Sequence, residues 1–512
     1  MKQVRTVLAL ALLATLAVGQ AFAAGQTEEG ATIEKPQISV AIFDRGRVPP
    51  EKGTYEENDV TEWINQNAPV NATFVAVPRW ETRQKYNLWL AAGEAPDIFM
   101  EYQPEMTQDF VNQGVLMELT EYIDEYGPNI RRETPPETAQ WGFYNDGEYA
   151  VPQIRPETAV ANWNMWIRTD WLDQLGLEMP RTTEEFYEVA KAFAEEDPDG
   201  TDAWGYNLSG ANVGGVAILG NMFGAMSGNW IMKDGELEVA WITENYRDAI
   251  ELASRLYAEG IADPEYFTDA GATQAIQDFV TGRIGIYAAN NRVRNDYTTL
   301  KENVPDAEVA PLPIPESPYG RFGFYQEREV ALLNMVPATS EQPEGAIMYL
   351  DWMLETGWEW VKYGEEGVHW EWQDGLRISV ADEETRRRDL AYRGDYPIMS
   401  LDLETADTLR VRYENVDPIQ REAWYLVADG IDTTLANPFT RYIPTNSLGL
   451  QLYTEIWPNL SSVADETWTQ AIIGEMSVDE AWTTIREEWD NLGYQDLKRQ
   501  INEKARELGH IN

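Results

Sequence analysis

Short apolar runs alternate with amphipathic stretches along the first part of the chain. Residues 38–43 form an apolar run that ends at the polar turn Asp44-Arg45-Gly46, a pattern typical of a strand and its loop. Two further strands are predicted at 71–77 and from 97, with helices at 61–67 and 82–92 between the strands. This β-α-β-α-β order predicts an α/β fold with mostly parallel sheets and helices on both faces.

The segment 145–206 suggests that the chain then builds a second lobe. It begins with a glycine turn and the apolar run Tyr149-Ala150-Val151-Pro152, followed by a Trp-rich stretch and an amphipathic helix that ends at Gly176. Helices are expected at 170–175, 183–194, 244–259 and 271–281, and a strand at 284–288. Two lobes with a cleft between them would trap a ligand.

The pattern gives an explicit division of the chain. We expect an N-terminal lobe from 36–157 with 320–366, and a C-terminal lobe from 158–319 with 375–512. The crossings between the lobes are expected near 152–160, 311–322 and 366–375, the second of them in a proline-rich stretch.

The N-terminus resembles a cleavable export signal. Lys2 and Arg5 precede an apolar run, and Ala21-Phe22-Ala23 has the spacing of a cleavage site, so residues 1–23 are expected to be removed. Residues 24–35 are expected to form a disordered spacer. The chain has no cysteine, which excludes a cysteine-linked lipid anchor, disulfides, thiolate metal sites and a cysteine nucleophile. A periplasmic location is the simplest expectation.

The chain is strongly acidic. Its formal net charge is −48, and without Lys2 and Arg5 it would be −50. No basic stripe is available to displace counterions, which argues against nucleic-acid binding. The same charge disfavours polyanionic sugars unless arginines gather locally.

Several segments resemble the extracellular solute-binding proteins of ABC importers. The block from 145 contains the motifs DGEYAVP and IRTDWLDQLGLEMP and ends in the turn DPDG. Four more segments resemble the family and occur in its order: LWLAAGEAPDIF at 88–99, GVLMELTEYIDEYGPNI at 114–130, FVTGRIGIY at 279–287 and YGEEGVHW at 363–370. The closest resemblance is to the large carbohydrate-binding branch, with its LplA-like lipoproteins and alginate-binding proteins.

This resemblance implies a periplasmic-binding-protein fold of two lobes joined by a multi-strand hinge, similar to the type II class. It also implies a monomeric, non-enzymatic receptor without a cofactor, which binds a sugar or oligosaccharide between its lobes and delivers it to membrane permease subunits. Two alternatives stay open at this point. One is a secreted carbohydrate-active enzyme, and the other is the same fold with a peptide or another polar metabolite as ligand.

An unusual aromatic content supports a sugar ligand, because 20 Trp and 25 Tyr residues are present. The apolar faces of pyranose rings stack on aromatic side chains, while the hydroxyls need polar partners. We therefore expect the ligand site where aromatic and polar residues alternate after predicted strands or near crossings. The candidates are Asp44, Arg45, Trp80, Glu101, Tyr102, Trp163, Asn164, Trp230, Asn290, Asn291, Arg292, His369, Trp370 and Trp372.

Asp197, Asp199 and Asp202 are a separate, weaker candidate for calcium. In the alginate-binding branch the matching turn is longer and holds this ion. Here the turn is short and lacks the bidentate glutamate of an EF-hand, which favours a simple helix-ending turn. His369 and His510 are the only histidines, so a histidine-based metal site or triad is not expected.

Overall fold

The computed structural model describes residues 34–144, 147–209, 215–269, 271–373, 375–437, 450–507 and 511. The predicted export signal, all but two residues of the predicted spacer, and His510 lie outside these ranges. Residues 37–512 form one compact unit, and the description below concerns this unit.

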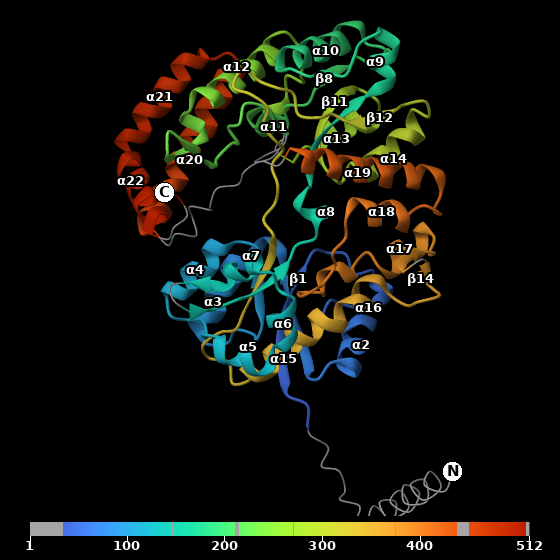
Figure 1. Ribbon diagram of the computed structural model, residues 1–512, viewed down its shortest axis with the longest axis vertical. Helices are drawn as coiled ribbons and strands as arrows, with labels where there is room; N and C mark the ends of the chain where they lie inside the picture. The colour runs from blue at the N-terminus through green and yellow to red at the C-terminus, as the bar shows by residue number, and fades with distance from the viewer. Residues whose placement is uncertain are drawn as a thin grey trace, which may run out of the picture. The chain divides into compact units, whose positions relative to one another are not determined.

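The first sheet begins with the predicted β-α-β-α-β order (Figure 1). Strand β1 (Gln37–Asp44) pairs in parallel with β2 (Asn71–Pro78), and β3 (Phe99–Glu101) follows a parallel bridge between Val40 and Ile98. Helix α2 (Asp59–Asn67) begins where the Asn58 side chain accepts hydrogen bonds from two backbone amides. Helix α3 (Thr82–Ala92) ends at Gly93, whose left-handed conformation closes the last turn.

The sheets are mixed, which corrects the expectation of mostly parallel strands. Strand β13 (Val330–Met335) lies antiparallel between β3 and β6 (Val151–Ile154). In the second sheet β11 (Ile284–Asn290) pairs in parallel with β8 (Trp204–Tyr206). The same strand is antiparallel to β7 (Trp163–Arg168), which is antiparallel to β12 (Val309–Pro311) on its other side. The reason lies in the chain path, because a strand that returns to a sheet runs against the strand by which the chain left.

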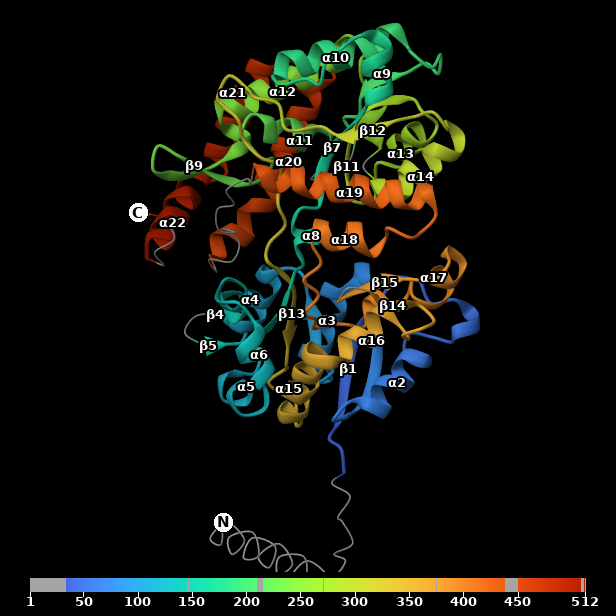
Figure 2. The same cartoon turned by 45° about the vertical axis from the view of Figure 1, so that its right-hand side comes forward.

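Helices and three small hairpins surround these sheets (Figures 1 and 2). In the segments 104–139 and 343–389 the helices are α4 (Pro104–Asn112), α5 (Thr120–Tyr126), α6 (Pro128–Glu133), α7 (Pro136–Ala139), α15 (Pro343–Trp352), α16 (Trp358–Tyr363) and α17 (Glu383–Asp389). In the segments 157–303 and 406–507 the helices are α8 (Glu157–Val160), α9 (Thr169–Leu175), α10 (Thr183–Glu196), α11 (Gly215–Met222), α12 (Glu244–Ala258), α13 (Thr273–Val280), α14 (Val293–Asn303), α18 (Ala406–Arg412), α19 (Pro418–Ala436), α20 (Gln451–Ile472), α21 (Val478–Asn491) and α22 (Tyr494–Glu507). The hairpins are β4 (Phe143–Tyr144) with β5 (Gly147–Glu148), β9 (Trp230–Lys233) with β10 (Glu236–Val239), and β14 (Trp370–Gln373) with β15 (Leu376–Ser379).

The buried apolar side chains fall into two sequence sets. Two clusters draw only on residues 38–151 and 330–399, and two others only on residues 161–324 and 406–511. This separation matches a fold of two lobes. The exact lobe boundaries stay a prediction, but the packing favours later second and third crossings, at 324–330 and 399–406. Leu312 and Ile314 of the proline-rich stretch already belong to the second set, and Tyr392 and Met399 to the first.

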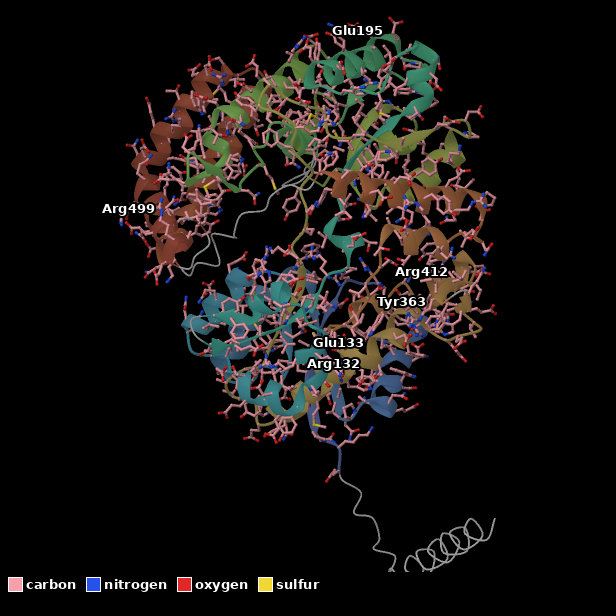
Figure 3. All side chains as sticks on the ribbon, in the orientation of Figure 1. Arg132, Glu133, Glu195, Tyr363, Arg412 and Arg499 are labelled. Atoms are coloured by element: carbon pink, nitrogen blue, oxygen red, sulfur yellow. The ribbon has the colours of Figure 1, made fainter. Side chains whose placement is uncertain are left out.

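The segment 399–406 is anchored by charged side chains. Lys362 and the hydroxyl of Tyr363, both on α16, contact the carboxylate of Asp402. Glu404 pairs with Arg412 on α18, and the Arg412 guanidinium lies 4.8 Å from the centre of the Tyr363 ring (Figure 3). The two sets of helices are thus tied together through this cluster. Within the described ranges, no helix is both long and apolar enough to cross a membrane.

Candidate functional site

Arg45 and Tyr102 meet at the carboxyl ends of β1 and β3. An Arg45 guanidinium nitrogen donates to the Tyr102 hydroxyl at 3.1 Å, and the rings of Phe43 and Tyr102 stack with centroids 5.6 Å apart. Arg45 also forms an ion pair with Asp395, whose carboxylate accepts a second hydrogen bond from Tyr55 at 3.0 Å. The structure therefore brings together two candidates that are more than fifty residues apart in the sequence.

Arg79 completes this group from the end of β2. Its guanidinium lies 4.8 Å from the ring centre of Phe43 and 5.1 Å from that of Tyr102, and it pairs with Glu101 at 3.3 Å. The Glu101 side chain is fully buried and also accepts hydrogen bonds from the Thr82 hydroxyl and the Tyr102 amide. Glu101 therefore positions Arg79 and is itself shielded from solvent.

Trp80 is the exposed member of the group. It lies in the single turn between β2 and α3 and is 93 % exposed, the highest exposure among the large hydrophobic side chains described. The Arg79 guanidinium lies 5.7 Å from its ring centre. A tryptophan in this position presents a large flat apolar face on which another ring can stack.

We refer to Phe43, Arg45, Arg79, Trp80 and Tyr102 as the arginine–aromatic cluster. Both arginines are balanced, Arg45 by Asp395 and Arg79 by Glu101. Below the cluster, burial and the neighbouring Glu101 hold the pKa of Tyr86 well above its usual value, and the Tyr86 hydroxyl donates to the Met100 carbonyl at 2.9 Å. The cluster offers hydrogen-bond donors and aromatic faces without a net positive charge.

The candidate residues of the second sheet lie where β7 begins and the neighbouring strand β11 ends. Asn290 of β11 pairs in register with Trp163 of β7. Asn164 is fully buried and accepts a hydrogen bond from the Thr434 hydroxyl at 2.9 Å, while the Asn291 side chain donates to the Thr158 carbonyl at 2.8 Å. Asn164 and Asn291 thus have internal partners, whereas Trp163 and Asn290 are partly exposed side chains at these strand ends.

Other candidates have structural partners. Arg292 pairs with Asp296 at 3.3 Å, and the Asp44 carboxylate accepts a hydrogen bond from the Gly46 amide. Trp230 is only 5 % exposed and stacks on Tyr494 in the second hydrophobic core. The packing of Trp230 favours a core role over ligand contact.

His369, Trp370 and Trp372 belong to a different place in the fold. His369 accepts a hydrogen bond from the Glu365 amide and Trp370 donates to the Gly364 carbonyl, so both support the turn before the β14–β15 hairpin. Trp372 is 51 % exposed. No contact between these side chains and the arginine–aromatic cluster is present among the residues described.

Four residues of the site environment are missing from the candidates, namely Phe43, Tyr55, Arg79 and Asp395. Arg79 had a local signal, because it directly precedes Trp80 at the end of a predicted strand. Asp395 had none, because it lies 350 residues from Arg45. Only the tertiary fold brings the two together.

The residues of the weak calcium candidate, Asp197, Asp199 and Asp202, all have partners within the protein. Both carboxylate oxygens of Asp197 accept backbone hydrogen bonds, from Thr201 and Asp202. Asp199 forms an ion pair with the buried Arg168 at 2.8 Å. The Arg283 guanidinium donates hydrogen bonds to the carbonyl oxygens of Thr201 and Asp202. In the described part of the chain no group of three or more potential metal ligands occurs. The carboxylates of Asp197 and Asp199 and the carbonyls of Thr201 and Asp202 thus have partners within the protein.

Comparison with known proteins gives consistent matches. Residues 50–360 match the family model described as bacterial extracellular solute-binding protein. The chain is 24 % identical, over 83 % of its length and 84 % of the relative, to the polygalacturonan/rhamnogalacturonan-binding protein YtcQ of Bacillus subtilis. The fold is similar to the alginate-binding protein AlgQ2 solved without calcium ion, with a TM-score of 0.69 and 19 % identity over 92 % of this chain and 98 % of that one. It is also similar to the substrate-binding protein FusA of S. pneumoniae in complex with kestose, with a TM-score of 0.69 and 17 % identity over 92 % and 99 % of the two chains.

Proposed function

Because the chain belongs to the bacterial extracellular solute-binding proteins, we propose that it is the substrate-binding component of an ABC importer and binds a sugar or oligosaccharide. The ligands named for YtcQ and FusA are carbohydrates, and the two-lobed fold is shared with FusA and AlgQ2. We propose further that the protein is exported, is a monomer without enzymatic activity, and delivers its ligand to membrane permease subunits.

The arginine–aromatic cluster is the observation that carries this proposal. A pyranose ring could stack on the exposed face of Trp80 while its hydroxyls accept hydrogen bonds from Arg45 and Arg79. The cluster follows the carboxyl ends of three neighbouring strands, which is where open α/β sheets bind ligands. Trp163 and Asn290 are the proposed contacts from the second sheet.

The charge balance of the cluster favours an uncharged sugar. Each arginine already faces a carboxylate, Asp395 for Arg45 and Glu101 for Arg79. An anionic ligand would find no unpaired cation in the cluster and a chain of net charge −48 around it. We therefore extend the proposal to a neutral mono- or oligosaccharide, in contrast to the polygalacturonan named for YtcQ.

The mechanism that follows is a population shift. A ligand that contacts the arginine–aromatic cluster and the strand ends around Trp163 makes all of its contacts only when the two lobes are closed. Binding then stabilises the closed state, which is the form to be recognised by the permease.

A ligand panel tests this proposal directly. Neutral and anionic mono- and oligosaccharides are screened by thermal shift with the purified protein, and each hit is followed by X-ray scattering for compaction and by a reducing-end assay for turnover. We expect a neutral sugar to raise Tm and compact the protein without being cleaved. Trp80→Ala should weaken the affinity for that sugar by roughly two- to tenfold. Phe267→Ala, a change of another exposed aromatic residue (47 % exposed), serves as control. Absence of any sugar response would refute the ligand class, and release of new reducing ends would refute the non-enzymatic role.

A further inference from the structure

Five of the chain's 20 tryptophans line a single pocket on the flank of the first lobe. The pocket has a volume of about 560 Å³ and is lined by Trp63, Trp352, Trp360, Trp370 and Trp372. These residues come from α2, from the region of α15 and α16, and from β14, which lie side by side in both ribbon views (Figures 1 and 2). We refer to this pocket as the tryptophan pocket.

Its aromatic wall is held rigidly in place. The rings of Trp63 and Trp360 stack with centroids 4.3 Å apart and an interplanar angle of 9°. The Trp352 ring lies directly against Gly357, where a Cβ atom would stand only 2.7 Å from it. Any larger residue at Gly357 would displace the ring. A preformed wall of this kind needs little ordering when a ligand binds.

The rim of the tryptophan pocket carries hydrogen-bonding groups. Asn67, Thr356, Glu365 and Glu366 line it and are all exposed. Within the described part of the chain, neither Glu365 nor Glu366 has an arginine or lysine partner. Free carboxylates around aromatic faces accept hydrogen bonds from sugar hydroxyls and repel uronates.

A second cavity shares Trp372 with the tryptophan pocket. It has a volume of about 610 Å³. Its lining includes Trp372, Gln373 and Gln420, and its charged members are Arg386 and the carboxylates of Glu371, Asp382 and Asp417. The Trp372 ring is half exposed and is supported by Arg377, whose guanidinium lies 4.7 Å from its centre. Trp372 therefore stands between two adjoining cavities, an arrangement that suits an extended chain better than a compact molecule.

The tryptophan pocket lies apart from the arginine–aromatic cluster. Asn67 ends α2 shortly before Asn71, and Asn71 pairs in register with Gln37 at the amino end of β1. The cluster instead follows the opposite, carboxyl ends of the strands. The pocket thus reaches the edge of the sheet that the proposed ligand site does not use.

We propose that the tryptophan pocket and the adjoining cavity form an accessory surface that binds a neutral polysaccharide or long oligosaccharide across Trp372. The surface is separate from the site proposed for the transported sugar, and the inference rests on the proposed function for its ligand class. Stacking on Trp372 provides the apolar contact, and the polar rims on both sides provide the hydrogen bonds.

Affinity electrophoresis tests the accessory surface. The full protein is run in native gels containing laminarin, galactomannan, arabinoxylan or, for comparison, polygalacturonate, and thermal shift with short neutral sugars is measured in parallel. We expect at least one neutral polymer to retard the wild type. Trp372→Ala should weaken this retardation by roughly two- to tenfold and Trp372→Phe by less, while the thermal shift with short sugars is unchanged. Phe267→Ala, which removes an aromatic residue of similar exposure elsewhere, should be retarded like the wild type.

Other outcomes would overturn the inference in distinguishable ways. Equal retardation of the wild type and Trp372→Ala, or no retardation by any neutral polymer, removes the accessory surface but leaves a thermal shift with short sugars as support for the proposed function. Loss of both responses in Trp80→Ala, with neither affected in Trp372→Ala, would assign all binding to the arginine–aromatic cluster. Stronger retardation by polygalacturonate than by neutral polymers would contradict the charge argument. No response in either assay would refute both proposals.

Discussion

Replacing Arg168 by alanine should destabilise the second lobe strongly. Arg168 ends β7 with a side chain that is only 1 % exposed, and its guanidinium donates to Asp170 and Asp199 at 2.8 Å and also lies over the ring of Trp171. Burial disfavours the charged guanidinium, but the carboxylates of Asp170 and Asp199 hold its pKa above the usual value. The arginine therefore stays charged and serves as the internal cation of the 197–202 turn.

The expected magnitude follows from the exposure of the partners. Removing one member of a fully buried ion pair costs about 3–5 kcal/mol. Asp170 and Asp199 are 23 % and 25 % exposed and can partly rehydrate, so we expect a loss near the lower end, about 3 kcal/mol. The second lobe, whose buried residues span 161–324 and 406–511, has about 270 residues, and for a unit of this size the loss corresponds to a fall in Tm of roughly 5 °C.

Thermal and urea unfolding followed by circular dichroism measure this effect. Arg168→Lys keeps the charge but loses the bidentate geometry, so its stability should lie between those of the wild type and Arg168→Ala. Arg499→Ala is the matched control, because Arg499 pairs with Asp496 and Glu503 on an exposed helix surface (Figure 3) and its loss should leave Tm unchanged.

Calcium provides the decisive comparison. If Arg168 supplies the positive charge of the turn, neither added calcium nor a chelator should shift the Tm of the wild type. A calcium-dependent rise of several degrees in the wild type, or an unchanged Tm for Arg168→Ala, would refute the assignment of Arg168 as the internal cation.

Two further changes test the packing and the electrostatics. Gly285→Ala would place a methyl group 2.2 Å from the buried ring of Phe193 and should cost about 1–3 kcal/mol in urea unfolding, whereas wild-type stability would show that the ring can move aside. Hydrogen bonding to Arg388 and the ion pair with Lys52 hold the pKa of Asp389 well below its usual value, so its contribution to stability is present above about pH 4 and is lost as the pH falls further. Asp389→Asn should therefore be less stable than the wild type at pH 7, and a difference that stays constant down to pH 2 would contradict this linkage.

Local patterns predicted the elements of the first lobe well. The helix expected at 82–92 is α3, because an amphipathic stretch followed by Gly93 determines both its face and its end. Local signals are less informative for the proline-rich stretch at 311–318. Prolines there mark an irregular chain path, but they do not reveal that Leu312 and Ile314 are buried in the second core.

The candidate site was predictable only where its residues follow strands. Trp80 and Tyr102 come directly after β2 and β3, so their meeting at one sheet edge follows from topology. The pairing of Arg45 with Asp395 depends on a contact across 350 residues, for which the local sequence gives no sign. Trp230 illustrates a second limit, because an aromatic residue near polar ones has the same local pattern whether it packs in a core, as its stacking on Tyr494 favours, or faces a ligand.

The way this chain uses its few cations bears on what it binds. Arg45, Arg79 and Arg168 each face at least one carboxylate in their surroundings, and none of them presents an unpaired charge. In these settings arginine offers directed donors and a flat face for stacking rather than a positive field. A site built from such residues recognises hydroxyl groups and ring faces, whereas a polyanion needs unpaired cations to offset the repulsion of the surrounding surface. The overall acidity and the neutralised arginines thus both favour the neutral carbohydrate ligand that we propose.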